Sequence, residues 1–393
     1  MKILVVCQFY YPERFVINKI AEELVKKGHE VDVLTGKPNY GYGYILPEYK
    51  HIREEMINGV TVYRVNLYPR KHTRLSIIRN YLSFYFNSKK WVRRCKKEYD
   101  VIYSMSLSPV TILAPGNLYK KKHHVPHVVH CVDLWPESPV ATHAVKRGSL
   151  VYKLLYRWSR KLYMGADKIL VGSPSFSEYF ADILKLPTNN ISYVPQCSLI
   201  DDEDITAYDF GPGKHILYCG NLGFIQLIPL ITEAMTLLNR DDVYFHIIGM
   251  GQLENFLKDD IKKRGLEKNV IYHGPMSAKL AASYYKGADA IYISLKNEEF
   301  VGKTIPNKLE MSLIFGKPII AVLKGDGRKV LQEAGGAIFA EENANSIKEA
   351  IISFLNLSHK EIDTWKMSYP LYYLNNFSVR RVTDLVEKSL RVK

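Results

Sequence analysis

Residues 2–36 read KILVVCQFYYPERFVINKIAEELVKKGHEVDVLTG. The apolar runs at 2–9 and 30–36 have the length of strands, whereas residues 17–28 repeat apolar positions at helical spacing and end at a glycine. A strand, a helix and a second strand in this order form a βαβ unit, whose two strands run parallel. This stretch therefore predicts an α/β fold built on a parallel sheet.

The same alternation continues along the chain with one interruption at residues 186–215, which are rich in turn-forming residues. A chain of 393 residues with 47% hydrophobic residues exceeds one ordinary core and can fill two. We therefore expect two Rossmann-like doubly wound domains at 1–190 and 191–365, and a helical stretch at 366–393 that returns to the first. The further strand-like runs lie at 61–68, 100–106, 127–133, 168–173, 215–223, 243–251, 269–275, 288–295 and 316–325.

The composition argues against several other classes of protein. No window is apolar enough to span a membrane, and the chain starts without a charged leader and cleavage site, so we expect a cytoplasmic protein. The five cysteines are widely spaced and never form C-x-x-C, which indicates neither zinc nor disulfides. The acidic run at 201–204 lies in the predicted linker and is expected to be a solvated turn. No bound metal is therefore expected.

Positive charge is concentrated in the first half. Residues 1–190 carry 30 Lys and Arg against 15 Asp and Glu, whereas the whole chain carries 54 against 40. Residues 70–97 contribute ten cations and no acid, and a helical wheel gathers many of their apolar residues into one stripe. Such a segment is typical of helices in an anionic bilayer interface, although a helix packed on its own domain has a similar pattern. We favour peripheral membrane contact through Arg74, Arg79, Lys89, Lys90, Trp91 and Arg93.

Two turns in the second half are suited to holding phosphate. Parallel sheets bind ligands at the carboxyl ends of their strands, where glycine lets backbone N–H groups approach phosphate. Residues 220–223 follow one predicted strand, and residues 302–308 place a glycine and two lysines around a proline suited to a helix start. Either turn alone is typical of an ordinary connection, but together they predict a phosphate site. Gly249 and Gly251 lack the third glycine of a dinucleotide fingerprint, so no nicotinamide cofactor is expected.

The order of these motifs carries a resemblance to a known family. The runs YCGNLG (218–223), IIGMG (247–251), VIYHGPM (270–276) and IPNKLEMSLIFGKPIIAV (305–322) resemble the donor half of retaining family 4 glycosyltransferases. The resemblance implies the GT-B fold, in which two Rossmann-like domains face each other. In the first half, QFYYPERFVINKIAEEL (8–24) and DLWPES (133–138) are similar to bacterial transferases that add N-acetyl-L-fucosamine-type sugars to lipid-linked capsule or O-antigen precursors.

The donor residues carry over unevenly. Many members have glutamates where this chain has Lys303 and Met311, while Glu310 is one residue out of register and Glu298 and Glu299 precede the loop. We therefore expect lysines to offset the diphosphate charge, with Lys303 in a catalytic role. The residues that the resemblance assigns to the donor are Gly220, Asn221, Gly223, Gly249, Pro275, Met276, Gly302, Thr304, Ile305, Pro306, Lys308 and Met311.

In the first half, the loop after the strand at 127–133 is implied to point toward the donor sugar and the acceptor. His130 and Asp133 are the predicted catalytic residues, although a core histidine and a helix-capping aspartate are the alternatives. The predicted acceptor residues are Tyr11, Arg14, Asn18, Tyr40 and Glu137.

These expectations describe a metal-independent hexosyltransferase that needs no cofactor beyond its UDP-sugar substrate. It would move the sugar, with retention, to a polyprenyl-diphosphate-linked saccharide at the inner face of the cell membrane. The rivals are a GT-B UDP-sugar epimerase or phosphorylase, and a degenerate partner subunit that lacks catalysis. A basic nucleic-acid-binding protein is a third rival, but no recognised nucleic-acid motif occurs, so no such partner is expected.

Overall fold

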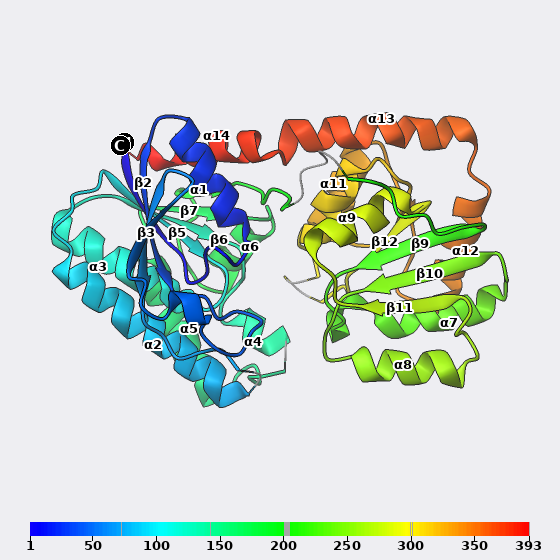
Figure 1. Ribbon diagram of the computed structural model, residues 1–393, viewed down its shortest axis with the longest axis horizontal. Helices are drawn as coiled ribbons and strands as arrows, with labels where there is room; N and C mark the ends of the chain where they lie inside the picture. The colour runs from blue at the N-terminus through cyan, green and yellow to red at the C-terminus, as the bar shows by residue number, and fades with distance from the viewer. Residues whose placement is uncertain (72, 142, 200–204, 299, 301, 393) are drawn as a thin grey trace. The chain divides into compact units, whose positions relative to one another are not determined.

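Two separate sheets organise the chain (Figure 1). The computed structural model describes residues 1–71, 73–141, 143–199, 205–298, 300 and 302–392, which leaves the acidic run at 201–204 outside the description. One compact unit comprises Met1–Cys197 and Val379–Lys393, and the other comprises Ser198–Ser378. Each unit has a mostly or wholly parallel sheet with helical connections, which confirms the predicted α/β class.

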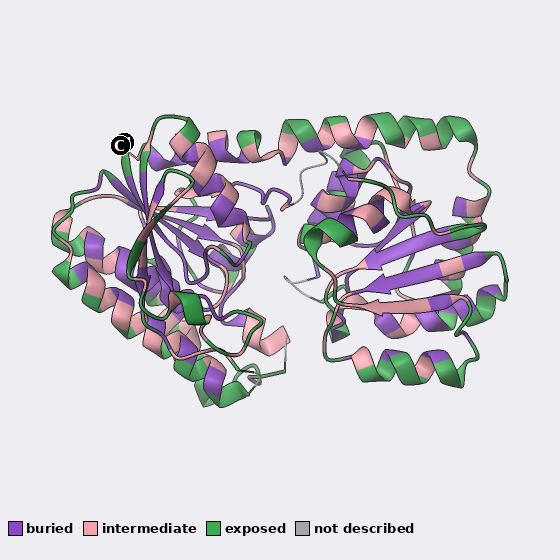
Figure 2. Cartoon of the chain, viewed as in Figure 1, coloured by how far each residue is buried: buried purple, intermediate pink, exposed green. Residues whose placement is uncertain are grey.

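The first unit contains an eight-stranded sheet in the order β3-β4-β2-β1-β5-β6-β7-β8. All neighbouring strands are parallel except β3 and β4, which pair antiparallel at the edge. The central strands are buried along most of their length, as the apolar runs predict for a parallel sheet covered on both faces (Figure 2). The strands are β1 (Lys2–Val6), β2 (Glu30–Gly36), β3 (Glu54–Ile57), β4 (Val60–Val65), β5 (Val101–Ser106), β6 (His127–Cys131), β7 (Lys168–Val171) and β8 (Ile191–Tyr193).

Helices connect these strands, and the chain returns to this unit at its end. Lys27, at the end of α1, donates hydrogen bonds to Asp384 (2.5 Å) and Glu387 (3.0 Å) of the last helix. The longer helices of the unit are α1 (Val16–Lys26), α2 (Arg74–Arg94), α3 (Leu113–His123), α4 (Glu137–Ala141), α5 (Leu150–Tyr163), α6 (Phe176–Asp182) and α14 (Val379–Leu390).

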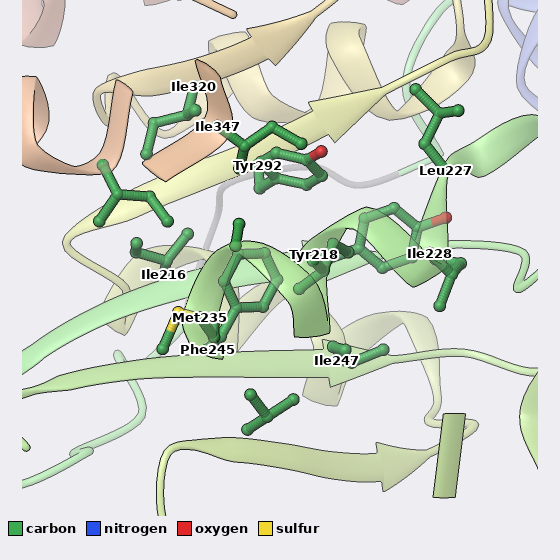
Figure 3. Packing of buried hydrophobic residues seen from close by; sticks show 14 of the residues in the cluster. Ile216, Tyr218, Leu227, Ile228, Met235, Phe245, Ile247, Tyr292, Ile320 and Ile347 are labelled. Carbon is green, nitrogen blue, oxygen red and sulfur yellow. The ribbon is translucent and has the colours of Figure 1, made fainter. Parts of the chain in front are cut away.

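The second unit contains a six-stranded parallel sheet in the order β11-β10-β9-β12-β13-β14. Side chains alternate between its faces, so that Ile216 and Tyr218 of β9 lie in one apolar cluster, with α7 and α12, and Leu217 lies in the other (Figure 3). Its strands are β9 (Lys214–Cys219), β10 (Val243–Ile248), β11 (Val270–Gly274), β12 (Ala290–Ser294), β13 (Ile319–Val322) and β14 (Ile338–Phe339). Its helices are α7 (Ile228–Leu238), α8 (Glu254–Lys263), α9 (Ala278–Gly287), α10 (Asn307–Ile314), α11 (Gly325–Glu333), α12 (Ala344–Leu355) and α13 (His359–Asn376).

The units divide later in the sequence than the expected boundaries at 190/191 and 365/366. Residues 191–197 stay with the first unit because β8 pairs with β7. Helix α13 stays with the second unit because Tyr369 is buried in its core and donates a hydrogen bond to the carbonyl of Gly336 (2.5 Å). Only α14, rather than the whole of 366–393, therefore belongs to the first unit.

Candidate active site

The loops after β9 and β10 are bound tightly to each other at the carboxyl end of the second sheet. The N–H of Gly220 donates to the carbonyl of Ile248, and the N–H of Leu222 donates to that of Met250, both at 2.9 Å. A Cβ on Gly249 would lie 1.8 Å from the carbonyl oxygen of Gly220. Glycine is therefore required at 249 by the close approach of two backbones, a packing role that needs no dinucleotide.

Lys308, in the first turn of α10, places its ammonium beside this turn. Its Nζ donates to the hydroxyl of Tyr218 at 3.0 Å and lies 4.1 Å from the centre of the same ring. That hydroxyl donates to the carbonyl of Asn221 at 2.5 Å, and a Cβ on Gly220 would lie 3.4 Å from Nζ. Burial lowers the pKa of Lys308 to about 7, with the nearby Cys219 acting in the opposite direction.

The loop before α10 is shaped by close packing. A Cβ on Gly302 would lie 2.2 Å from the carbonyl oxygen of Lys296, so this position excludes a side chain. Pro306 is the N-cap residue of α10, one position earlier than a first-turn proline. Lys303 is exposed, and its carbonyl accepts the N–H of Asp326 at 2.8 Å. Lys308 is thus held beside the glycine turn, whereas Lys303 is exposed on the loop before α10.

The glutamates near this loop differ sharply in environment. Glu310 is 2% exposed, and burial raises its pKa well above the usual range. Glu298 is on the surface, where Lys296 pairs with it, and Glu299 lies outside the described residues. Met311 is partly buried against the second unit's core. Its thioether is only a weak hydrogen-bond acceptor, so it does not replace a glutamate that would bind a ribose.

The remaining predicted donor residues lie at several depths. Asn221 and Pro275 are exposed, and Thr304 is partly buried. The N–H of Gly223 donates to Oε1 of Gln226 at 3.1 Å, which holds the turn closed. Two others are apolar packing residues of the core cluster, namely the buried Ile305 and the partly buried Met276.

His130 of β6 lies in the core of the first unit. It is fully buried, its Nδ1 accepts from the hydroxyl of Tyr103 (2.8 Å), and its Nε2 donates to the carbonyl of Val194 (2.9 Å). Burial also lowers its pKa to about 4. Both ring nitrogens are occupied by the fold, so the predicted catalytic role is corrected to that of a core histidine.

Asp133 follows β6 at the carboxyl end of the first sheet. Its N–H donates to the carbonyl of Ser106 at 3.3 Å, which fixes the backbone at the strand end. Burial raises the pKa of its carboxyl group to about 7. A carboxyl group that titrates near neutrality is suited to accepting a proton, so Asp133 rather than His130 is the candidate base.

Glu137 is placed differently from the acceptor residue that we expected. It is buried, pairs with Arg147, and accepts a hydrogen bond from the hydroxyl of Tyr152 at 2.7 Å. These bonds connect α4 to α5 and the segment before it. Glu137 is therefore a structural residue of the first unit.

The exit loop of β1 is held by Asn18 and by a residue that sequence reasoning missed. Asn18 is buried, accepts the N–H of Phe15 (3.3 Å) and donates to the carbonyl of Glu13 (3.0 Å). Glu13 accepts the N–H of Asn39 (2.6 Å) and that of Tyr40, and burial raises its pKa to about 7. The role of Glu13 could not be predicted from the neighbouring sequence, because the N–H groups that it accepts belong to Asn39 and Tyr40.

Tyr40 and Arg70 form the accessible part of this edge. Tyr40 is 44% exposed and packs against the rings of Phe9 and Phe15. The guanidinium of Arg70 lies 5.2 Å from the centre of the Tyr40 ring and 5.5 Å from that of Tyr81. Sequence reasoning assigned Arg70 only to the basic segment, because no local pattern reveals the two rings.

Tyr11 is half-buried, whereas Arg14 is exposed to solvent. The carbonyl of Tyr11 accepts from Nη2 of Arg64 at 2.6 Å, and burial together with a hydrogen bond to Glu22 raises the pKa of its hydroxyl to about 12. Of the predicted acceptor residues, Arg14 and Tyr40 are thus exposed and Tyr11 is half-buried.

Family comparisons match both units separately. Residues 14–197 match the Glycosyl transferase 4-like domain, and residues 203–366 match the Glycosyl transferases group 1 domain. Each half of the chain thus matches a glycosyltransferase domain, and the chain has the GT-B fold. Both matches agree with the motifs that carried the resemblance in the sequence.

Two relatives match most of the chain. The uncharacterized glycosyltransferase MJ1607 of Methanocaldococcus jannaschii is 26% identical, covering 88% of this chain and 87% of the relative. The putative colanic acid biosynthesis glycosyl transferase WcaI of Escherichia coli is also 26% identical, covering 80% of this chain and 82% of the relative. The structure of Anabaena HepE with UDP and glucose shares the fold at a TM-score of 0.71, with 14% identity and 99% of each chain covered.

The basic helix α2 of the glycosyltransferase has two distinct faces. Phe84 and Val92 are buried in the core of the first unit, and Trp91 packs on Tyr63 with 5.0 Å between ring centres. Trp91 therefore faces the domain, which corrects its assignment to the membrane group. Lys89 donates to the hydroxyl of Tyr85 (3.0 Å) on the flank of the helix. The exposed members of the predicted membrane group are Arg74, Arg79, Lys90 and Arg93.

The described residues contain neither a candidate membrane-spanning helix nor a candidate metal site. No helix in the described part of the chain is both long and apolar enough to cross a membrane. No cluster of three or more His, Cys, Asp or Glu within those residues is arranged to hold a metal ion.

A substitution at His130 tests whether this residue is structural or catalytic. Replacing His130 with Gln disrupts two buried hydrogen bonds, each of which costs about 1–3 kcal/mol when a buried group is left unsatisfied. We expect a lower urea midpoint, measured by circular dichroism, and unchanged activity per folded molecule. A large loss of activity at an unchanged midpoint would instead support a catalytic histidine.

Proposed function

We propose that the protein transfers a sugar from a UDP-sugar to a polyprenyl-diphosphate-linked saccharide, with retention, in the synthesis of a bacterial capsule or O-antigen. N-acetyl-L-fucosamine is the first donor sugar that we propose to test. Support comes from the family matches and from the relative WcaI, whose name is that of a putative colanic acid biosynthesis glycosyl transferase. The HepE structure, which contains UDP and glucose, supports UDP as the nucleotide.

The ammonium of Lys308 is the observation that carries this proposal. Lys308 is half-buried, its Nζ donates to the hydroxyl of Tyr218, and among the residues that the structure describes no carboxylate pairs with it. A buried cation without an anionic partner is unfavourable, so the site is built for an anion that arrives from outside. The start of α10 would add the positive end of its helix dipole to the charge of the ammonium at the same place.

We propose that charge stabilisation by Lys308 replaces a metal ion. As the bond between the sugar and the diphosphate breaks, negative charge grows on the diphosphate oxygens. A desolvated ammonium favours that charge more strongly than an exposed one does. In the first unit, Asp133 would accept the proton of the attacking acceptor hydroxyl, because its pKa lies near neutrality.

The proposed location is the cytoplasmic face of the cell membrane, through peripheral contact. The exposed cations of α2, which include Arg79, Lys90 and Arg93, would contact anionic lipids where the acceptor is embedded. Tyr40 and Arg70 would contact the acceptor itself, through ring stacking and through its diphosphate.

The experiment that tests the proposal combines binding with product analysis. We expect UDP to raise the melting temperature of the purified protein, and a screen of UDP-sugars with a lipid-linked saccharide to yield one extended product. Anomeric analysis of that product by NMR reports retention. An epimerised free UDP-sugar would support the epimerase instead, and neither binding nor turnover with any UDP-sugar would overturn the proposal.

A further inference from the structure

Helix α5 of the first unit exposes an apolar face that the sequence did not single out. Leu150 (79%), Val151 (55%) and Leu154 (65%) are largely exposed to solvent. Lys153, Arg157 and Lys161 are exposed on the same helix, and residues 150–163 contain no acid. A surface helix normally turns its large apolar side chains toward the core, so this face indicates contact with another apolar phase.

Helix α2 exposes a matching stripe on its outer side. The side chains of Leu75, Ile78, Leu82 and Phe86 are 39–62% exposed, although the opposite side of the helix is buried in the core. Residues 74–94 also contain no acid. Both helices therefore combine exposed apolar groups with uncompensated positive charge.

The two helices that carry these stripes are in contact. Helices α2 and α5 touch through Tyr85 and Trp158, whose rings meet edge to face with 5.6 Å between centres. At about 100° per residue, Ile78 and Leu82 lie about 20° and 60° beyond Tyr85, turning away from the buried face of α2. On α5, Leu154 lies about 40° beyond Trp158, again away from the buried face. The exposed apolar groups thus flank the contact between the helices on its outer side.

We propose that α5 joins α2 in one surface that binds an anionic lipid bilayer. The apolar side chains would enter the acyl boundary, while the cations around them would contact phosphate headgroups. The charge of the surface selects this occupant, because a second copy of the chain would bring the same cations against it. The inference deepens the membrane association proposed above and adds a helix that it did not contain.

Sedimentation with lipid vesicles tests the inference on the full chain. The vesicles are phosphatidylcholine alone, or phosphatidylcholine mixed with phosphatidylglycerol. We expect binding to the mixed vesicles only, and a decrease of roughly tenfold or more in the partition coefficient for Leu150→Ser/Leu154→Ser. The matched control is Leu371→Ser/Leu374→Ser on α13, whose side chains are 60% and 59% exposed, and it should bind as the wild type does.

Each other outcome has a defined meaning. Wild-type partitioning of the α5 variant, or equal binding to neutral vesicles, overturns the inference. So does a change in oligomeric state for the α5 variant without a change in partitioning, because that result identifies a second copy as the occupant. Melting curves should coincide for all variants, since exposed substitutions change stability little.

Vesicle binding can be measured whether or not the protein transfers a sugar. Transfer to a short-chain, water-soluble acceptor should proceed at the wild-type rate in the α5 variant. If no UDP-sugar is turned over and the vesicle pattern is still observed, the proposed function fails and the lipid surface stands.

Discussion

Replacing Lys308 with Met is expected to weaken UDP-sugar binding by roughly 100-fold, because a desolvated charge-assisted hydrogen bond contributes about 2–3 kcal/mol. The variant removes the cation that lies beside the turn at 220–223 and leaves the apolar stem of the side chain in place. The measurement is isothermal titration calorimetry with UDP, which contains the diphosphate that the ammonium would contact. Unchanged affinity would contradict the role that we give to this ammonium.

The same substitution should stabilise the free protein. The folded-state pKa of Lys308 is about 7, against an unfolded value of about 10.4. Below pH 7 both states are protonated, and the folded state carries the full cost of the buried charge. As the pH rises from 7 toward 10, the folded state releases its proton first and the cost disappears. The melting temperature of Lys308→Met should therefore exceed that of the wild type most clearly at or below pH 7, and by little near pH 10.

The pH dependence of UDP-sugar affinity is a second test of the charge on Lys308. The diphosphate favours the ammonium form, so its binding raises the pKa of Lys308 and takes up a proton above pH 7. Wild-type affinity should then fall by up to about tenfold per pH unit above 7, and Lys308→Met should lose this slope. Lys303→Met is the matched control, because Lys303 is exposed, whereas Lys308 is packed on the ring of Tyr218. It should retain both the affinity and the slope.

Replacing Asp133 with Asn is expected to lower kcat by roughly 100- to 1000-fold, within the usual contribution of a general base. The pKa of Asp133 is about 7, so the wild-type rate should fall as the pH drops through 7, and the remaining activity of the variant should lack this acid limb. Initial rates with a lipid-linked acceptor, measured from pH 5 to pH 9, are the test.

Stability distinguishes this effect from unfolding. The folded state holds the proton of Asp133 more tightly than the unfolded chain, so the wild type loses stability as the pH rises from about 4 to 7. Asp133→Asn removes that loss and should melt higher than the wild type at pH 8. Glu137→Gln is the contrasting control, since it removes a buried carboxylate that pairs with Arg147 and accepts from Tyr152, and it should melt lower. Wild-type turnover in Asp133→Asn would exclude it as the base.

The candidate site was only partly predictable from sequence. The glycine turn and the start of α10 are visible locally, because glycine spacing, proline and lysine are all within a few residues. The choice between Lys303 and Lys308 was not, since the hydroxyl that receives Lys308 belongs to Tyr218, 90 residues earlier. The structural role of His130 was not predictable either, because its hydrogen-bond partners are Tyr103 and Val194, which lie on other segments.

The sequence by itself determined the two sheets, their parallel strands and the family, because these follow from apolar periodicity and from motifs that are contiguous in the chain. Only the tertiary structure decided which lysine lies at the glycine turn, that α13 belongs to the second unit, and which face of α2 meets solvent. It also brought α5 beside α2 through Tyr85 and Trp158. The physical reason is that burial and pairing depend on side chains from distant segments, whereas periodicity reports only on neighbours along the chain.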